Sequence, residues 1–148
     1  MNVIMIGAGN VATHIALRLK EKGHTPIQVW SRTKESAKTL AEQTGSDPVT
    51  SIDDIRTDAD IYIISVKDDA LQNVAKQLGE KPINGIVIHT AGSMAMDVLE
   101  GSCKHYGVLY PMQTFSKAKT VDFGRIPCFV EASDEETKRT VRELAEIL

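Results

Sequence analysis

The stretch that decides the fold opens the chain: Met1-Asn2-Val3-Ile4-Met5-Ile6-Gly7-Ala8-Gly9-Asn10-Val11-Ala12. Its apolar run, Val3–Ile6, predicts a buried parallel strand, and a helix is predicted directly after it at Val11–Leu19. The turn between them has the pattern G-x-G-x-x-A, which is typical of dinucleotide-binding proteins when a strand precedes it and a helix follows. The sequence therefore predicts a nucleotide site at this turn. The alternative is a tight turn that holds no ligand.

Each small residue of the turn has a separate role. Gly7 permits the tight turn, Gly9 lets the backbone approach a pyrophosphate, and Ala12 lets the helix lie close to the strand. The first turn of the helix offers free N–H groups and a partial positive charge to the anion. The residues that we expect to contact the pyrophosphate are Gly7, Ala8, Gly9, Asn10 and Val11.

Length and charge narrow the class of protein. A chain of 148 residues is about one domain, and 17 basic against 20 acidic residues give a net charge of −3. This charge argues against a general surface for nucleic acid or anionic membrane. The apolar runs are far shorter than the roughly 20 residues that cross a bilayer, and no basic leader precedes the first one. We expect a cytoplasmic protein whose partner is a small molecule, with neither nucleic acid nor membrane as a partner.

The cysteines and histidines predict no metal site. Cys103 and Cys128 lie far apart in the sequence, and neither they nor the histidines have the spacing that zinc sites commonly use. We expect both cysteines to be reduced and packed rather than reactive.

Strand and helix signals alternate along the whole chain, which is typical of the α/β class. They predict a doubly wound, mostly parallel sheet of the Rossmann type with helices on both faces. Further strands are predicted at Pro26–Trp30, Pro48–Thr50, Ile61–Val66, Gly85–His89, Val108–Tyr110 and Cys128–Val130. Further helices are predicted at Lys34–Gln43, at Ala70–Leu78 with Asp68 or Asp69 as cap, and near Met94–Glu100 with Ser93 as cap.

The last helix is predicted from a capping box, Ser133-Asp134-Glu135-Glu136, followed by an apolar stripe at Val141, Leu144 and Leu148. The chain stops within this helix, before any further strand or second domain. We therefore expect residues 1–148 to be the nucleotide-binding domain of a longer enzyme.

The end of the second predicted strand indicates which nucleotide binds. Sites that prefer NAD place an Asp or Glu there to accept hydrogen bonds from the ribose, but here no carboxylate occurs before Glu35. Ser31, Arg32 and Thr33 instead offer a guanidinium and two hydroxyls, which suit a 2′-phosphate. The sequence thus favours NADP(H) over NAD(H). The alternative is an arginine that is simply solvated.

Three segments carry a family resemblance: Val3–Ala12 with Ser31–Thr33, then His89-Thr90-Ala91-Gly92-Ser93, and Tyr110-Pro111-Met112-Gln113-Thr114-Phe115-Ser116-Lys117. Over essentially its whole length, the chain resembles the N-terminal Rossmann-like domain of a bacterial family described as NADP oxidoreductases, in which a helical domain of unknown function follows. That group is similar to pyrroline-5-carboxylate reductases, deazaflavin-dependent NADP oxidoreductases and β-hydroxyacid dehydrogenases. The resemblance implies that a helical domain completes the substrate cleft and commonly forms the homodimer, so we expect turnover and dimerisation in the full-length protein.

Ligands of open α/β sheets bind at the carboxyl ends of the strands, so strand ends yield the remaining candidates. Ser65, Val66 and Lys67 follow the fourth strand, and in similar reductases this segment passes beside the nicotinamide ribose. His89 ends the fifth strand and is the candidate proton donor, because imidazole titrates near neutrality. The alternative for His89 is a hydrogen bond to a neighbouring loop.

Two further side chains are candidates for substrate contacts. Ser93 can hydrogen-bond the substrate, and Gln113 can orient a carbonyl or carboxylate. The alternatives are a plain helix cap for Ser93 and a solvated surface position for Gln113.

These candidates predict an NADP(H)-binding domain of an oxidoreductase that transfers hydride between nicotinamide and a small carbonyl, imine or hydroxy acid. Two alternatives stay open. One is a module that senses NADP(H) and catalyses nothing, and the other is a reductase that exchanges hydride between NADP and a deazaflavin.

Overall fold

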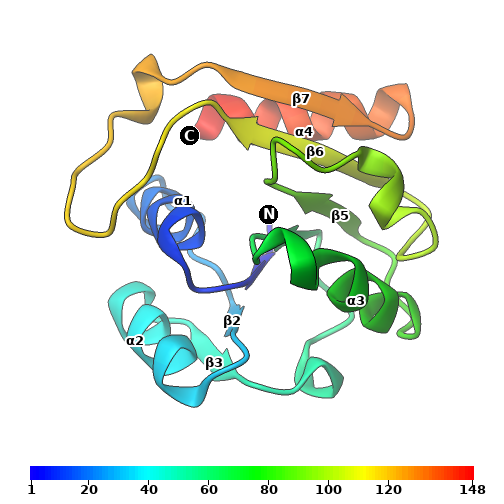
Figure 1. The fold of residues 1–148 in the computed structure, drawn as a ribbon, viewed down its shortest axis with the longest axis horizontal. Coiled ribbons are helices and arrows are strands. Elements are labelled where there is room, and N and C mark those ends of the chain that lie inside the picture. Colours follow the sequence, from blue (N-terminus) through cyan, green and yellow to red (C-terminus); the bar gives the residue numbers. More distant parts are fainter.

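Seven strands form one sheet in the computed structural model, which describes residues 1–148 (Figure 1). Their order is β3-β2-β1-β4-β5-β6-β7, and all neighbours are parallel except β6 and β7. The predicted doubly wound Rossmann-like sheet is therefore confirmed. The strands are β1 (Val3–Ile6), β2 (Gln28–Trp30), β3 (Asp47–Val49), β4 (Ile61–Ile64), β5 (Ile86–His89), β6 (Tyr106–Pro111) and β7 (Cys128–Ala132).

Helices cover both faces of the sheet. The α-helices are α1 (Asn10–Glu21), α2 (Lys34–Thr44), α3 (Asp68–Gly79) and α4 (Glu135–Ile147). Three short 3-10 helices lie in the connections between strands: η1 (Ile52–Asp54), η2 (Met96–Leu99) and η3 (Phe123–Arg125). One face packs against α1, α2 and α4, and the other against α3, η1 and η2. None of the helices combines the length and the apolar character needed to cross a bilayer.

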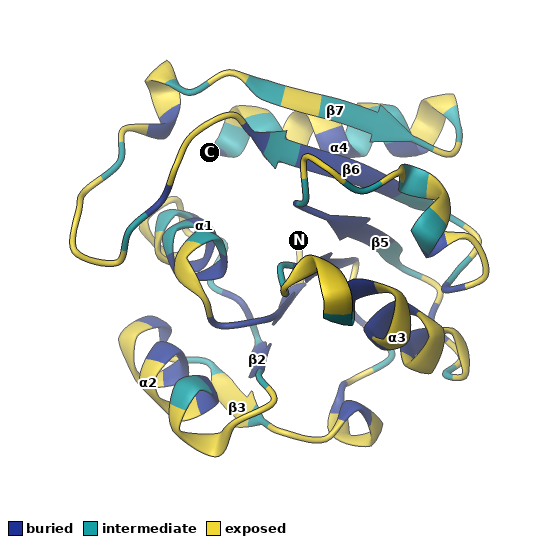
Figure 2. Ribbon diagram, viewed as in Figure 1, coloured by how far each residue is buried: buried dark blue, intermediate teal, exposed yellow.

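The alternation of side chains in β1 explains why its run is apolar throughout. Val3 and Met5 pack among the side chains of α1, whereas Ile4 and Ile6 pack on the opposite face, among those of α3. All four are fully buried, as parallel strands with helices on both faces require. Figure 2 shows this buried centre in dark blue, with the exposed surfaces of the helices turned outward.

The end of β1 is the point where the strand order reverses. Beyond Ile6, the N–H of Gly7 donates to the Trp30 carbonyl at the end of β2 (2.7 Å), and the N–H of Ser65 donates to the Ile6 carbonyl (2.8 Å). The chain segments leaving β1, β2 and β4 are thereby held together at one place. This is where sheets of this kind bind ligands.

Two predicted helix starts are wrong. The expected helix Met94–Glu100 is only the 3-10 turn η2, whose N-cap is Ala95, and Ser93 caps nothing. Helix α3 begins at Asp68 with Lys67 as N-cap, so neither Asp68 nor Asp69 acts as the cap. The Ser93 hydroxyl donates instead to the Asp68 carboxylate, and the Asp69 side chain faces solvent.

The predicted capping box of α4 is also wrong in detail. The N-cap is Asp134, whose carboxylate accepts from the Thr137 N–H (2.8 Å) and the Thr137 hydroxyl (2.9 Å). Ser133 instead accepts a hydrogen bond from the N–H of Tyr106 on the neighbouring strand (3.1 Å). Tertiary pairing of Ser133 therefore moves the cap by one residue.

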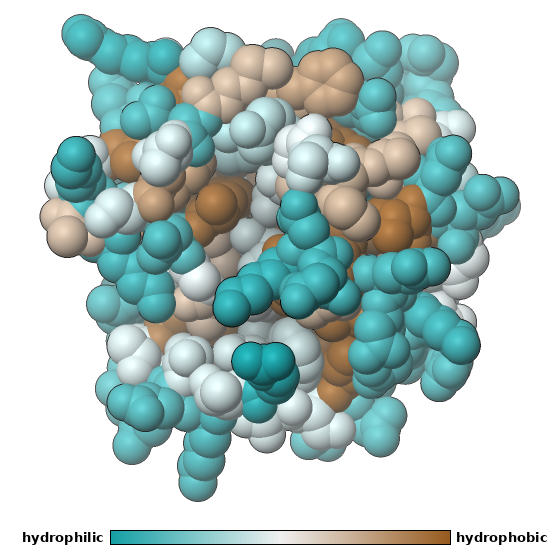
Figure 3. Space-filling model, viewed as in Figure 1, coloured by the Kyte–Doolittle hydropathy of each residue, from teal (hydrophilic) through white to brown (hydrophobic).

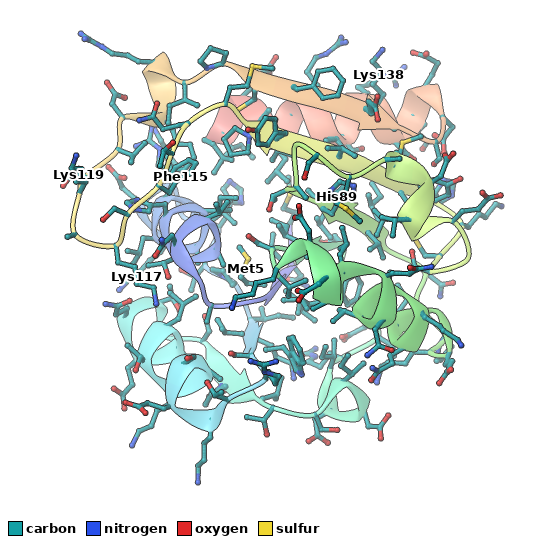
Figure 4. All side chains as sticks on the ribbon, viewed as in Figure 1. Met5, His89, Phe115, Lys117, Lys119 and Lys138 are labelled. Carbon is teal, nitrogen blue, oxygen red and sulfur yellow. The ribbon has the colours of Figure 1, made fainter.

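The connection between β6 and β7 lies along α1. Phe115 is 7% exposed and belongs to the core on that face, where its ring contacts His14 (centroids 5.2 Å) and Phe123 (5.7 Å). The His14 ring also makes a hydrogen bond with the Ser116 carbonyl. Figure 4 shows Phe115 reaching from this segment towards α1. Thus one aromatic ring fixes a long connection against α1.

Phe115→Ala should lower the free energy of unfolding by about 3 kcal/mol, because it removes a buried ring and leaves a cavity between α1 and the connection. Met112→Ala is the matched control: Met112 is 50% exposed in the same connection, and its loss should cost no more than about 0.5 kcal/mol. Urea denaturation of both variants checks this. Equal losses would contradict the anchoring role of Phe115.

Candidate dinucleotide site

The first turn of α1 is open to an anion. Its N-cap, Gly9, makes no side-chain hydrogen bond, and the turn contains no acidic residue. The other α-helices differ, because Thr33 and Asp134 cap α2 and α4 with side chains and α3 carries two aspartates in its first turn. A Cβ atom built on Gly9 meets nothing within 4 Å, so there is free space directly against the backbone. Free N–H groups facing free space are what a pyrophosphate needs.

Gly7 is required for a different reason. Its φ of 126° is a conformation that residues with side chains rarely adopt, and a Cβ atom there would collide with the Ser65 carbonyl. Ala8 and Ala12 are buried, and Ala12 packs in the core between α1 and the sheet. In the G-x-G-x-x-A pattern, Gly7 thus allows the backbone to pass close to Ser65, Gly9 leaves open space beside the backbone, and Ala12 lets α1 pack close to the sheet. Asn10 is exposed and Val11 half-buried in the first turn.

The Ser31-Arg32-Thr33 segment lies between β2 and α2 with its polar groups available. Arg32 is exposed and forms no ion pair. Thr33 caps α2 by accepting from the Ser36 N–H (3.4 Å), which leaves its O–H free to donate. The Ser31 N–H donates to the Val49 carbonyl (3.2 Å), and its hydroxyl has no partner in the chain. A phosphate bound here would supply the missing charge partner.

Ser65, Val66 and Lys67 leave β4 beside Gly7. Lys67 is exposed and unpaired, while the Ser65 hydroxyl accepts a hydrogen bond from the Thr90 hydroxyl at 3.0 Å. Thr90 thereby connects the segment after β5 to the segment after β4. Sequence reasoning did not single out Thr90 for this contact, although it lies in the quoted segment His89–Ser93.

His89 is fully buried, and both of its ring nitrogens are occupied. Nδ1 accepts a hydrogen bond from the Ala91 N–H (3.1 Å), and Nε2 lies 3.2 Å from the Ala95 carbonyl, to which it donates. This arrangement requires the neutral ring with its proton on Nε2. Burial lowers the pKa of His89 below its ordinary value, although Ala95 and the nearby Asp68 and Glu131 oppose the shift. Figure 4 shows His89 in the interior between β6 and α3.

The geometry of His89 favours the alternative of a loop contact over proton donation. Its imidazole holds residues 90–95 in place by binding the backbone near both ends of the segment. In this arrangement it has no nitrogen left for a substrate. The proton-donor role of His89 therefore stays a prediction that this conformation does not favour.

Ser93 and Gln113 lie on the surface of the same edge. The Ser93 hydroxyl donates to the Asp68 carboxylate at 2.6 Å, which ties the segment after β5 to the first turn of α3. Gln113 is exposed, and its side chain has no partner in the chain. Sequence reasoning missed Asp68 as the partner of Ser93, because the pair is 25 residues apart. Figure 3 shows hydrophilic side chains around the rim of the molecule and apolar groups between α1 and β6.

Gly7→Ala and Gly9→Ala should separate folding from binding. Gly7→Ala should lower the free energy of unfolding by at least about 2 kcal/mol, since it forces a strained backbone against Ser65. Gly9→Ala should change stability by no more than about 1 kcal/mol, yet weaken NADPH binding at least about tenfold, because its methyl group occupies the open space. Thermal unfolding and calorimetric titration with NADPH test the pair. A Gly9→Ala chain that binds NADPH normally would contradict the site.

His89 should make stability depend on pH. Because its folded pKa lies below the unfolded value near 6.5, its contribution is present above that pH and is lost as the pH falls towards the folded pKa. The free energy of unfolding should therefore decrease between pH 8 and pH 5, by up to about 1.4 kcal/mol per pH unit, and His89→Asn should flatten this slope. Asp134 does not interfere, since its pKa is lowered from 3.8 and it titrates below this window. Parallel slopes for the two proteins would refute the assignment.

Solved structures of other proteins share the fold of this chain. Among solved structures, a Bacteroides fragilis protein assigned as an NADP oxidoreductase is 42% identical, with a TM-score of 0.94 over 99% of this chain and 57% of that chain. Prephenate dehydrogenase from A. aeolicus (16% identity, TM-score 0.82) and a pyrroline-5-carboxylate reductase from Coxiella burnetii (18%, 0.81) share the fold. Each matches 99% of this chain, which spans 57% and 56% of their lengths.

The family itself follows from a match over most of the chain. Residues 2–95 fit the model of a family described as NADP oxidoreductases dependent on coenzyme F420. This segment runs from β1 to the end of the loop after β5, so it contains the open helix terminus, Arg32 and His89. NADP is the coenzyme named for this family, and the predicted resemblance is confirmed. The chain belongs to the coenzyme F420-dependent NADP oxidoreductase family.

Proposed function

We propose that this chain holds NADP(H) across the end of β1, with the pyrophosphate on the first turn of α1. The observation that carries the proposal is the combination at Gly9 of uncapped N–H groups with free space against the backbone. Ala8, Asn10 and Val11 complete the turn that would surround the anion. The open space at Gly9 leaves the backbone of this turn accessible to a pyrophosphate.

Preference for the 2′-phosphorylated coenzyme is attributed to Arg32. Its unpaired guanidinium can bind a phosphate through two parallel hydrogen bonds, and the free hydroxyls of Ser31 and Thr33 can add to them. No carboxylate stands at the end of β2 to repel the phosphate. The whole segment thus suits a dianion better than a ribose diol.

The reacting end of the coenzyme is assigned to the segments after β4 and β5. Ser65, Val66 and Lys67 would lie beside the nicotinamide ribose, and Ser93 and Gln113 would contact substrate. When bound, NADPH supplies a hydride, for which we propose a small carbonyl, imine or hydroxy-acid substrate class. His89 acts here by holding residues 90–95 in position. We further propose that the full-length protein is a cytoplasmic homodimer that acts on a small molecule.

Two other functions have an observation in their favour. The family description names coenzyme F420, which favours a deazaflavin as the hydride partner of NADP. The occupied nitrogens of His89 and the occupied hydroxyl of Ser93 favour a module that binds NADP(H) without catalysis. Both share the coenzyme site proposed above and differ only at its reacting end.

Arg32→Ala should weaken NADPH binding by at least about tenfold and NADH binding by less than about twofold, because only NADPH carries the 2′-phosphate. Lys38→Ala is the control, since Lys38 is an exposed cation one turn into the same helix, where it faces Glu42 at 3.9 Å. It should change neither affinity. Equal losses for both coenzymes in Arg32→Ala would refute the assignment.

The three functions can be separated in one experiment. Fluorescence titration, with the largely buried Trp30 as internal reporter, measures binding of NADPH and NADH. NADPH oxidation by the full-length protein is then followed with an α-keto acid, a cyclic imine and coenzyme F420 as acceptors. Oxidation by F420 alone supports the deazaflavin alternative, whereas tight NADPH binding without any oxidation supports the sensing module.

A further inference from the structure

Tyr110 lies on the same face of the sheet as His89, nearer to the carboxyl edge. His89 on β5 pairs with Val108 on β6, and Tyr110 is the next residue of β6 on that face. The segment between β5 and η2 crosses this face and binds the His89 ring through Ala91 and Ala95. The phenol of Tyr110 therefore lies beside residues 90–95, which the His89 ring holds in place.

Gly92 makes direct contact with the Tyr110 ring. A Cβ atom built on Gly92 would lie 2.6 Å from Cε2 and 2.7 Å from Cε1, and closer still to Cζ, which carries the hydroxyl. Only the absence of a side chain at Gly92 allows the ring to occupy this place. The far end of the phenol is thus positioned by the His89–Ser93 segment.

The Tyr110 hydroxyl differs from its polar neighbours in being free. His89 uses both nitrogens, the Thr90 hydroxyl donates to Ser65, and the Ser93 hydroxyl donates to Asp68. Trp30 Nε1 is the only buried side-chain polar atom without a partner, so the unbonded hydroxyl of half-buried Tyr110 reaches solvent. At this edge Tyr110 offers a hydroxyl that makes no hydrogen bond within the chain.

We propose that Tyr110, rather than His89, is the catalytic hydrogen-bond donor to the substrate. This inference rests on the proposed function and deepens it, because it requires a substrate with an acceptor atom at the reacting centre, such as a carbonyl oxygen or imine nitrogen. When bound, the reduced nicotinamide would supply the hydride for the new C–H bond. The π pair of that centre would move to the acceptor atom, and Tyr110 would give this atom its phenol proton. The phenolate regains a proton from water, so charge and protons balance. His89 and Gly92 are positioning residues for this phenol.

The position of Tyr110 can be tested without turnover. The three tyrosines of the chain are labelled as 3-fluorotyrosine, and Tyr110→Phe identifies the Tyr110 signal in the ¹⁹F spectrum. NADP⁺ should shift this signal, whereas adenosine 2′,5′-bisphosphate, which lacks nicotinamide, should leave it in place. The signal of fully buried Tyr62 serves as the internal control. Gly92→Ala, which displaces the ring, should reduce the response to NADP⁺.

Failure of this inference differs from failure of the proposed function. If NADP⁺ binds but the Tyr110 signal stays unchanged, or moves equally with adenosine 2′,5′-bisphosphate, the inference is wrong while the coenzyme site stands. If neither ligand binds, the proposed function fails and this inference with it.

The role of Tyr110 as donor is tested separately, by measuring the rate of hydride transfer to any acceptor that the protein reduces. Tyr110→Phe should slow hydride transfer at least about 100-fold and leave the Kd for NADPH within about twofold. Tyr106→Phe, at the other end of β6, is the matched control and should alter neither. A Tyr110→Phe protein with the rate of the wild type would overturn the proposal. If no acceptor is reduced, the NMR comparison decides.

Discussion

The backbone leaving β1 passes so close to the Ser65 carbonyl, just beyond β4, that Gly7 has no room for a Cβ atom. This contact brings together the segments that follow two strands at the reversal of strand order. Because the chain turns there with a φ of 126°, it enters α1 at once, with Gly9 as N-cap and no side chain over the first turn. The open helix terminus, the free space at Gly9 and the nearby Ser65–Lys67 segment all follow from this one crossing. Because only glycine fits at position 7, the chain turns there into a helix whose first N–H groups are open to an anion.

A second constraint acts after β5. Residues 90–95 form no helix, and the buried imidazole of His89 holds them in place. It accepts a hydrogen bond from the Ala91 N–H and donates one to the Ala95 carbonyl. A neutral ring with both nitrogens occupied is a good structural element and a poor acid. The same segment presents Gly92 to Tyr110 and Ser93 to Asp68. A proton for the substrate therefore has to come from a neighbour of His89.

How much the sequence predicted depends on the range of the interactions. The buried strands were predicted well, because a run such as Val3–Ile6 is apolar on both faces whatever surrounds it. The start of α2 at Lys34 was predicted correctly, but the two serine caps were not, because a serine side chain can bond either to its own helix or to a distant partner. Ser133 pairs with the Tyr106 N–H on the next strand, and Ser93 pairs with Asp68 on α3. Neither choice can be seen in a local pattern.

The candidate site shows the same division. The tight turn at Gly7 and the open backbone at Gly9 were predicted correctly, because both depend on local backbone geometry. The role of Arg32 in binding the coenzyme stays a prediction. His89 was correctly placed at a strand end, but its burial and its two backbone partners depend on how the following loop folds back. The contact between Gly92 and Tyr110 joins two strand ends, and only the parallel pairing of β5 and β6 brings them together.

We propose that the first turn of α1 binds the coenzyme pyrophosphate through its backbone. Amide chemical shifts of the ¹⁵N-labelled chain, recorded during titration with NADPH, test this most directly. The largest shifts are expected at the amides of Gly9, Asn10 and Val11, with smaller ones after β2. Saturating NADPH that leaves these three amides unmoved, or that shifts amides only at another edge of the sheet, would contradict it.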